Sequence, residues 1–187
     1  MSKTGIGRLS RKHRHWLILA GLVLALVLVN VSIWQKESLL RDGEIIYLDL
    51  APVDPRSLMQ GDYMTLSYQL ARSLRQRLAT DASGRTEPTD GRIRVTVDER
   101  GVATLAGLYD GGELAANERL VAYRVRNNRV KLASNAFFFQ EGHGDFYEGA
   151  RYGQFRVAAD GELLLTGLYD AQLQRLGPEP RNQSEAR

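Results

Sequence analysis

The chain has 187 residues, of which 43% are hydrophobic and 25% charged, so its composition is that of a folded protein and excludes wholesale disorder. It contains no cysteine, which excludes disulfide bonds, thiolate catalysis and Cys-ligated zinc. The formal net charge is +3, but five Lys and Arg residues precede the first apolar stretch, and the remaining 20 basic and 22 acidic residues sum to −2. Because the basic character is confined to the N-terminus, binding to nucleic acid is not indicated.

Residues 16–34 form an apolar segment without a charge, bounded by Trp16 and Trp34. At about 1.5 Å per residue this segment nearly crosses a ~30 Å hydrocarbon layer, and indole rings favour both interfaces. The segment is longer than the ~7–15 apolar residues of a cleaved signal peptide, and no small-residue cleavage site follows it. It therefore predicts one uncleaved transmembrane helix.

The basic residues before this helix predict its orientation. Residues 1–15 are expected in the cytoplasm, since loops rich in Lys and Arg stay inside. Residues 35–176 are then expected to form an extracytoplasmic domain, in the periplasm if the cell is Gram-negative, with the protein anchored in the cytoplasmic (inner) membrane. Residues 177–187 read as a disordered tail.

A polar stalk, residues 35–42, is followed by a stretch whose side chains alternate between the two faces of a predicted β-strand. Gly43 to Leu50 predicts a strand with Ile46, Leu48 and Leu50 on one face. Turns are expected at Asp54-Pro55-Arg56 and at Gly61-Asp62, followed by a strand over 63–68.

The apolar period then changes from two residues to four. Leu70, Leu74 and Leu78 recur every four residues with arginines between them, which predicts a short amphipathic helix. This helix is expected to pack over a sheet, and the alternative is that it lies on the bilayer. Residues 80–91 are expected to form a loop by their composition.

Three hairpins are predicted in the second half, around Asp98–Gly101, Asn127-Asn128 and Asp160-Gly161. The first and third resemble each other at an offset of 60 residues, and both end in Gly-Leu-Tyr-Asp. The matching pairs are Val97/Val157, Gly101/Gly161, Leu105/Leu165, Gly107/Gly167, Leu108/Leu168, Tyr109/Tyr169 and Asp110/Asp170. We therefore expect a mainly β fold, an antiparallel β-sandwich or half-open barrel with pseudo-symmetric hairpins and one short helix.

The stretch "GDYMTLSY", Gly61 to Tyr68, fills every fixed position of the pattern that names the bacterial GDYXXLXY family, so the chain resembles that family. A second block, "FFFQEGHGDFYEGARYGQFRV" (Phe137 to Val157), is similar to the segment in which family members carry an aromatic strand, a Glu-Gly loop and a Tyr-Gly. The resemblance implies a membrane-anchored extracytoplasmic protein, often associated by gene neighbourhood with multi-span membrane proteins, and it implies no particular activity.

Both segments are candidates for a partner-binding surface. The candidate residues are Asp54, Arg56, Gly61, Asp62, Tyr63, Leu66, Tyr68, Glu141, Gly142, Tyr147, Arg151, Tyr152 and Gly153. The structural alternative is that Gly61 and Asp62 build a turn and that one tyrosine, with a bonded hydroxyl, lies in the core while the other is more exposed. Arg151, between two tyrosines, could also stack on a ring.

A second, weaker site is metal-capable. Glu141, His143 and Asp145 could hold a divalent cation, although their spacing matches neither an EF-hand loop nor a metalloprotease helix, and a solvated Gly-rich loop is the simpler interpretation. No cofactor is predicted.

The predicted function is binding rather than catalysis. It has no nucleophile–base pair that would indicate an enzyme. The favoured hypothesis is an accessory protein that binds a multi-span inner-membrane protein. The alternative is an extracytoplasmic sensor or carrier that binds a small ligand or cation between the pseudo-symmetric hairpins.

Overall fold

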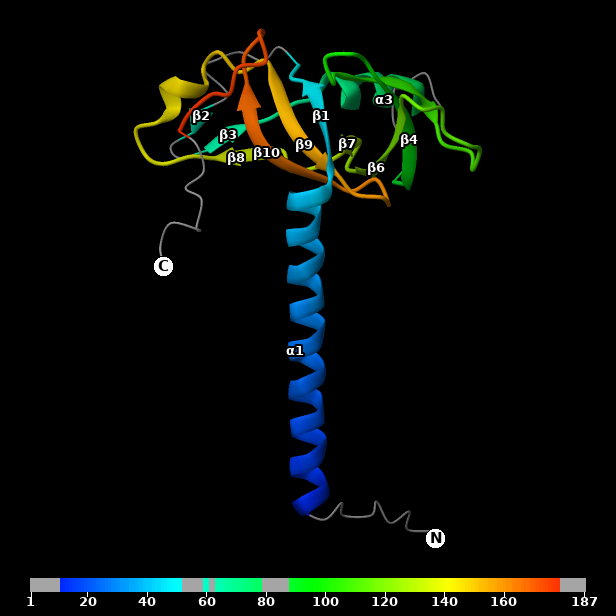
Figure 1. The fold of residues 1–187 in the computed structure, drawn as a ribbon, viewed down its shortest axis with the longest axis vertical. Coiled ribbons are helices and arrows are strands. Elements are labelled where there is room, and N and C mark those ends of the chain that lie inside the picture. Colours follow the sequence, from blue (N-terminus) through cyan, green and yellow to red (C-terminus); the bar gives the residue numbers. More distant parts are fainter. Residues whose placement is uncertain (1–10, 52–58, 61–62, 79–87, 179–187) are drawn as a thin grey trace. The chain divides into compact units, whose positions relative to one another are not determined.

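The computed structural model describes residues 11–51, 59–60, 63–78 and 88–178 and divides the chain into two compact units, residues 1–41 and 42–187 (Figure 1). The first unit is the N-terminal helix, and the second is the β domain. The candidate residues Asp54, Arg56, Gly61 and Asp62 lie outside the described residues, as does most of the predicted tail.

Helix α1 (Arg11–Asp42) contains the predicted span, and within it Ile18–Asp42 is long and apolar enough to cross a membrane. Its apolar side chains are exposed along the span, Trp16 and Trp34 among them. The predicted stalk, residues 35–42, is a continuation of this helix, because neither Gly nor Pro occurs within those residues.

The domain is built from short antiparallel strands, with one α-helix, α3 (Gln69–Leu78), and a 3₁₀ turn, η1 (Gly144–Tyr147), among its described residues. The strands are β1 (Glu44–Asp49), β2 (Met59–Gln60), β3 (Tyr63–Thr65), β4 (Asp90–Val97), β5 (Ala103–Leu108), β6 (Glu118–Arg126), β7 (Arg129–Lys131), β8 (Ala136–Phe138), β9 (Tyr152–Val157) and β10 (Leu163–Tyr169). They form three sheets, in the orders β1-β9-β10, β2-β3-β8 and β5-β4-β6-β7.

The predicted internal repeat is confirmed in three dimensions. The β4–β5 and β9–β10 hairpins each contain one bulge, at Ala106 and Thr166, which lie 60 residues apart. Both turns close with the glycine N–H donating to a carbonyl three residues earlier, at 2.9 Å, from Gly101 and from Gly161. The third predicted hairpin, β6–β7, turns at Asn127 and Asn128, whose φ values of 52° and 60° agree with the left-handed conformation expected there.

Each repeated hairpin rests its tip on the other sheet. The backbone N–H of Tyr47 in β1 donates to Gly101 O at 2.8 Å, and the N–H of Ala122 in β6 donates to Gly161 O, also at 2.8 Å. These reciprocal contacts join the two sheets, whose strands curl together as a half-barrel (Figure 1). The predicted mainly β, half-open fold is therefore correct.

Helix α3 covers this half-barrel. Leu70 and Leu74 are buried in the common core, and Leu78 packs partly against it, as the four-residue spacing predicts. The helix therefore packs over the sheet, and the alternative of a helix lying on the bilayer is not adopted. The core also contains alternate residues of β1, Ile46 and Leu48, which lie on one face of the strand as predicted.

Two predicted boundaries are wrong. The loop expected over 80–91 ends earlier, because β4 begins at Asp90, where Asp90 pairs with Arg126 and Tyr123 packs so close to Gly91 that a side chain there would clash. The strand expected over 63–68 ends at Thr65, because the chain then changes its pairing partner from β8 to the residues after β1. Ala51 N–H donates to Ser67 O at 2.8 Å, and Tyr68 bridges Leu50.

Candidate functional site

The two segments singled out by the sequence are neighbours in the fold. Strand β3, from the GDYXXLXY motif, pairs antiparallel with β8, from the phenylalanine-rich block. In this register Tyr63 lies opposite Phe138 and Met64 opposite Phe137. Residues that are about 75 positions apart in the chain therefore form one surface.

An aromatic pair, the half-buried Tyr63 and the exposed Phe138, marks this surface. Their ring centroids are 5.8 Å apart, and Phe138 is 74% exposed. On either side of Phe138, the rings of Phe137 and Phe139 turn inward and pack against the buried Tyr147. An aromatic side chain held so far into solvent by an ordered strand is typical of a surface that binds another molecule.

Several predicted contact residues belong to the core instead. Leu66, Tyr68, Tyr147 and Gly153 are buried, so they support the surface rather than touch a partner. The structural alternative predicted that one tyrosine of the motif lies in the core and the other is more exposed. This is confirmed, since Tyr68 is 2% exposed and Tyr63 is only half-buried.

The environment of Tyr68 explains its place in the motif. Its hydroxyl donates to Ser134 O at 2.6 Å, and its ring meets Phe155 edge-on at 5.5 Å. Burial raises the pKa of Tyr68 well above its ordinary value, because the core disfavours a phenolate. This tyrosine is therefore a neutral donor that ties the motif to the loop before β8.

Arg151 and Tyr152 form a separate polar cluster at the start of β9. Arg151 Nε lies 3.3 Å from Asp49 Oδ1, so its charge is paired with a carboxylate and not with the neighbouring rings. Tyr152 lies opposite Asp49 in one ladder and opposite Tyr169 in the other. Asp49 was not singled out from the sequence, because its pairing with Arg151 depends on the β1–β9 register.

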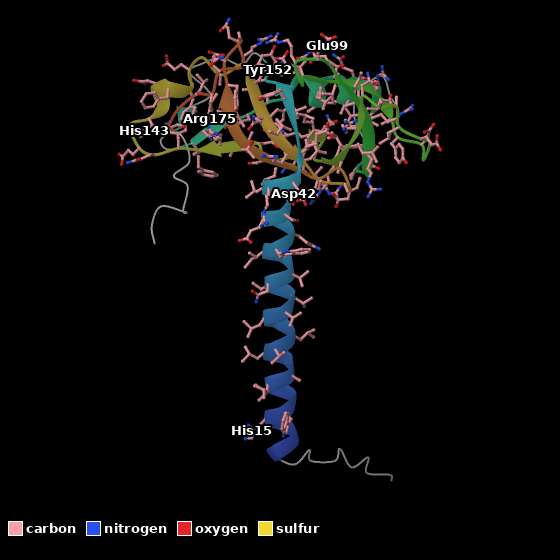
Figure 2. The ribbon with its side chains drawn as sticks, in the orientation of Figure 1. His15, Asp42, Glu99, His143, Tyr152 and Arg175 are labelled. Atoms are coloured by element: carbon pink, nitrogen blue, oxygen red, sulfur yellow. The ribbon has the colours of Figure 1, made fainter. Side chains whose placement is uncertain are left out.

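The metal-capable residues do not form a metal site. Among the described residues there is no group of three or more His, Asp and Glu side chains that could hold an ion, and Glu141, His143 and Asp145 belong to that part of the chain. They lie in the turn around Gly142 and in η1, outside both repeated hairpins. His143 packs instead against Phe146, at 5.3 Å between ring centroids, and lies apart from Tyr152 (Figure 2).

The predicted Gly-rich loop is also more regular than expected. His143 N–H donates to Gln140 O at 3.0 Å, and the 3₁₀ turn follows at once. Phe146 is 54% exposed on this turn, and Glu141 and Gly142 are exposed beside it.

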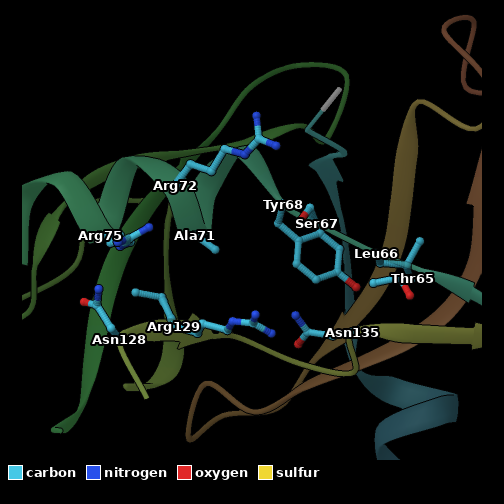
Figure 3. Close-up of a pocket in the computed structure, with 11 residues that line it drawn as sticks. Thr65, Leu66, Ser67, Tyr68, Ala71, Arg72, Arg75, Asn128, Arg129 and Asn135 are labelled. Atoms are coloured by element: carbon cyan, nitrogen blue, oxygen red, sulfur yellow. The ribbon is translucent and has the colours of Figure 1, made fainter. Parts of the chain in front are cut away.

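A groove of about 400 Å³ lies between the motif and α3, and the sequence did not reveal it (Figure 3). Its lining is Thr65, Leu66, Ser67, Tyr68, Ala71, Arg72, Arg75, Asn128, Arg129, Val130 and Asn135. The spacing of Arg72 and Arg75 on a predicted helix was visible in the sequence, but only the fold brings the β6–β7 turn opposite them.

These features define a class: a curled antiparallel β domain that follows one helix able to cross a bilayer. The family model of the GDYXXLXY protein matches residues 25–168, most of the chain, and the chain belongs to this family. No curated protein and no solved structure matches the chain.

Proposed function

We propose that this protein is an accessory subunit, held in the cytoplasmic membrane by α1, whose extracytoplasmic domain binds a multi-span membrane protein. The surface proposed for this contact centres on the aromatic pair, Tyr63 and Phe138, and includes the turn with the exposed Phe146. The observation that carries the proposal is the β3–β8 pairing, which unites the family motif with the second block.

Burial and chemistry support this choice of surface. Apolar residues exposed elsewhere in the described part of the domain are aliphatic and less exposed, for example Leu108 at 45% and Leu114 at 38%. Aromatic side chains contribute most to binding in protein interfaces because they bury a large area with little loss of rotamer freedom. Among the described residues of the domain, the ordered, exposed Phe138 is therefore the strongest anchor.

The proposed topology rests on the basic residues that precede the apolar segment of α1. With these residues in the cytoplasm, the domain lies on the opposite side of the membrane. A fusion of alkaline phosphatase to the C-terminus should be active, and a fusion of green fluorescent protein transported through the general secretory route should be dark. The reverse pattern, or release of the domain from the membrane, contradicts the anchored topology.

The partner role is tested by purifying the full chain in mild detergent after cross-linking in cells, followed by quantitative mass spectrometry. We expect one multi-span protein to be enriched with the native chain and to be lost with Phe138→Ala. Leu108→Ala is the matched control, since it also truncates an exposed apolar residue of a strand in the same domain but leaves the aromatic pair intact. Equal enrichment with both variants contradicts the proposed surface.

A further inference from the structure

In the groove between the motif and α3, here called the arginine groove, the charged side chains among the described lining residues are all arginines. Arg72 and Arg75 lie three residues apart on α3, and Arg129 begins β7 across from them (Figure 3). No Asp or Glu is among the described residues that line it. Like charges at this helical spacing repel each other, so the groove favours a negatively charged occupant.

Three ion pairs between described residues of the domain lie outside this groove. Arg119, Arg126 and Arg151 each pair with a carboxylate, those of Glu44, Asp90 and Asp49 respectively. Neither Arg75 nor Arg129 forms an ion pair with any described residue, and both are exposed. Their guanidinium groups can therefore take up a ligand without first breaking an internal ion pair with those residues.

Neutral hydrogen-bonding groups complete the lining. Ser67 and Thr65 supply hydroxyls, and Asn128 and Asn135 supply amides. The backbone of Asn128 has φ 60° in the β6–β7 turn, and this conformation fixes the position of its Cβ atom. The hydroxyl of Tyr68 is already bonded to Ser134 O, so Tyr68 contributes a wall rather than a donor.

A second groove shows that an excess of arginine is not general to this surface. It lies where the tip of the β9–β10 hairpin meets β6, and it is lined by Arg92 and Arg124 together with three carboxylates, those of Asp90, Asp160 and Glu162. Its charges are nearly balanced, and Arg92 Nε is bonded to Asp160 O at 2.9 Å. The arginine groove is thus distinct in both sign and number of charges.

We propose that the arginine groove binds the phosphate group of a small phosphate ester. Guanidinium groups bind phosphate oxygens with paired, charge-assisted hydrogen bonds, and several of them around one site favour a phosphate over a singly charged carboxylate. A volume of about 400 Å³ suits a small molecule of this kind. This site does not depend on the proposed partner surface, because it uses none of the exposed aromatic residues.

The phosphate group can come from a soluble ester or from a lipid headgroup, and two probes separate these sources. The full chain in a sugar-based detergent is titrated by calorimetry with glycerol 3-phosphate and, separately, with the water-soluble dihexanoyl phosphatidylglycerol. We expect saturable binding of at least one probe, and the tighter probe identifies the source. Affinity should fall as salt rises, because screening weakens the attraction between exposed charges.

Variants test whether the groove is responsible. Arg75→Gln and Arg129→Gln should each weaken binding about tenfold, since each removes a charge-assisted hydrogen bond. Lys131→Gln is the matched control: Lys131 is exposed two residues beyond Arg129 in β7, carries the same charge and does not line the groove. Melting curves should be unchanged in all three variants, because these side chains are exposed.

Two results overturn the proposal. The first is the absence of binding by either phosphate probe; a glutamate-rich peptide is titrated in the same way, and its binding in that case assigns the groove to an acidic protein segment. The second is binding that survives both arginine variants or that Lys131→Gln weakens equally, which indicates unspecific attraction to positive charge.

Discussion

Replacing Gly161 by alanine tests whether the reciprocal docking of the two hairpins holds the half-barrel together. Gly161 has φ +91°, and a Cβ added there would lie 3.0 Å from Ala122 N and 3.3 Å from the carbonyl of Leu120. Both neighbours are backbone atoms of β6, which cannot rotate away as a side chain can. The hairpin tip must therefore move off β6 and weaken the bond between Ala122 N–H and Gly161 O.

The expected loss of stability in Gly161→Ala is the sum of a conformational cost and the cost of a lost hydrogen bond. An alanine with a positive φ costs about 1–2 kcal/mol. Loss of the backbone hydrogen bond, with its N–H left without a partner, adds about 1–3 kcal/mol. We therefore expect Gly161→Ala to lower the free energy of unfolding by about 2–5 kcal/mol.

Two other glycines serve as matched controls. Gly111 has φ +94° but no atom within 4 Å of its added Cβ, so Gly111→Ala should cost only the backbone strain of about 1–2 kcal/mol. Gly101, with φ +80°, would meet only the ring of Tyr47 at 3.2 Å, and its alanine variant should fall between the two. The gain from a stiffer unfolded chain is common to all three variants and cancels in the comparison.

The assay is urea unfolding of the full chain in detergent, followed by the near-ultraviolet circular dichroism of tyrosine. All eight tyrosines follow residue 42, whereas both tryptophans, Trp16 and Trp34, lie in α1, so tyrosine reports on the domain. Equal losses for Gly161→Ala and Gly111→Ala would show that contact with β6 adds nothing to stability and would refute the reasoning.

Two more predictions concern single polar groups. Tyr68→Phe should lower the free energy of unfolding by about 1 kcal/mol in the same assay, because it removes the hydrogen bond that the buried Tyr68 side chain donates to Ser134 O, and an unchanged stability would contradict the role given to that hydroxyl. The hydrogen bond from Arg126 lowers the pKa of Asp90, so Arg126→Gln should raise that pKa towards its ordinary value, as measured by carboxyl-carbon NMR. Since the pKa of Asp90 is lowered in the folded state, the contribution of this pair to stability is present above the ordinary carboxyl pKa and is lost as pH falls. If Arg126→Gln leaves the pKa of Asp90 in the folded protein unchanged, the pairing is contradicted.

Local signals in the sequence were sufficient for most of the secondary structure. The leucine spacing of α3, the alternation in β1 and the Asn127-Asn128 turn each depend on residues within a few positions of one another. The predictions failed where a distant partner decided the outcome. Strand β4 begins earlier than its composition suggests because Arg126 and Tyr123, from β6, hold Asp90 and Gly91 in the sheet.

The candidate site was predicted only in part, for the same reason. The motif and the phenylalanine-rich block were recognised as separate segments, but their union depends on the pairing of Tyr63 with Phe138. Burial then divided the predicted residues: Leu66 and Tyr147 support the surface from within, and Tyr63 and Phe138 reach solvent. The pairing of Arg151 with Asp49 depends in the same way on the β1–β9 register.

By itself, the sequence determined that one apolar segment can cross a bilayer and that two similar hairpins recur in a β domain, because hydrophobicity and turn chemistry act over short stretches of chain. Only the tertiary structure decided that these hairpins rest on each other's sheets, through Gly101 and Gly161, and that Arg75 and Arg129 face one groove. Those choices are made when the buried faces of distant strands pack into a common core, and no short stretch of the sequence contains that information.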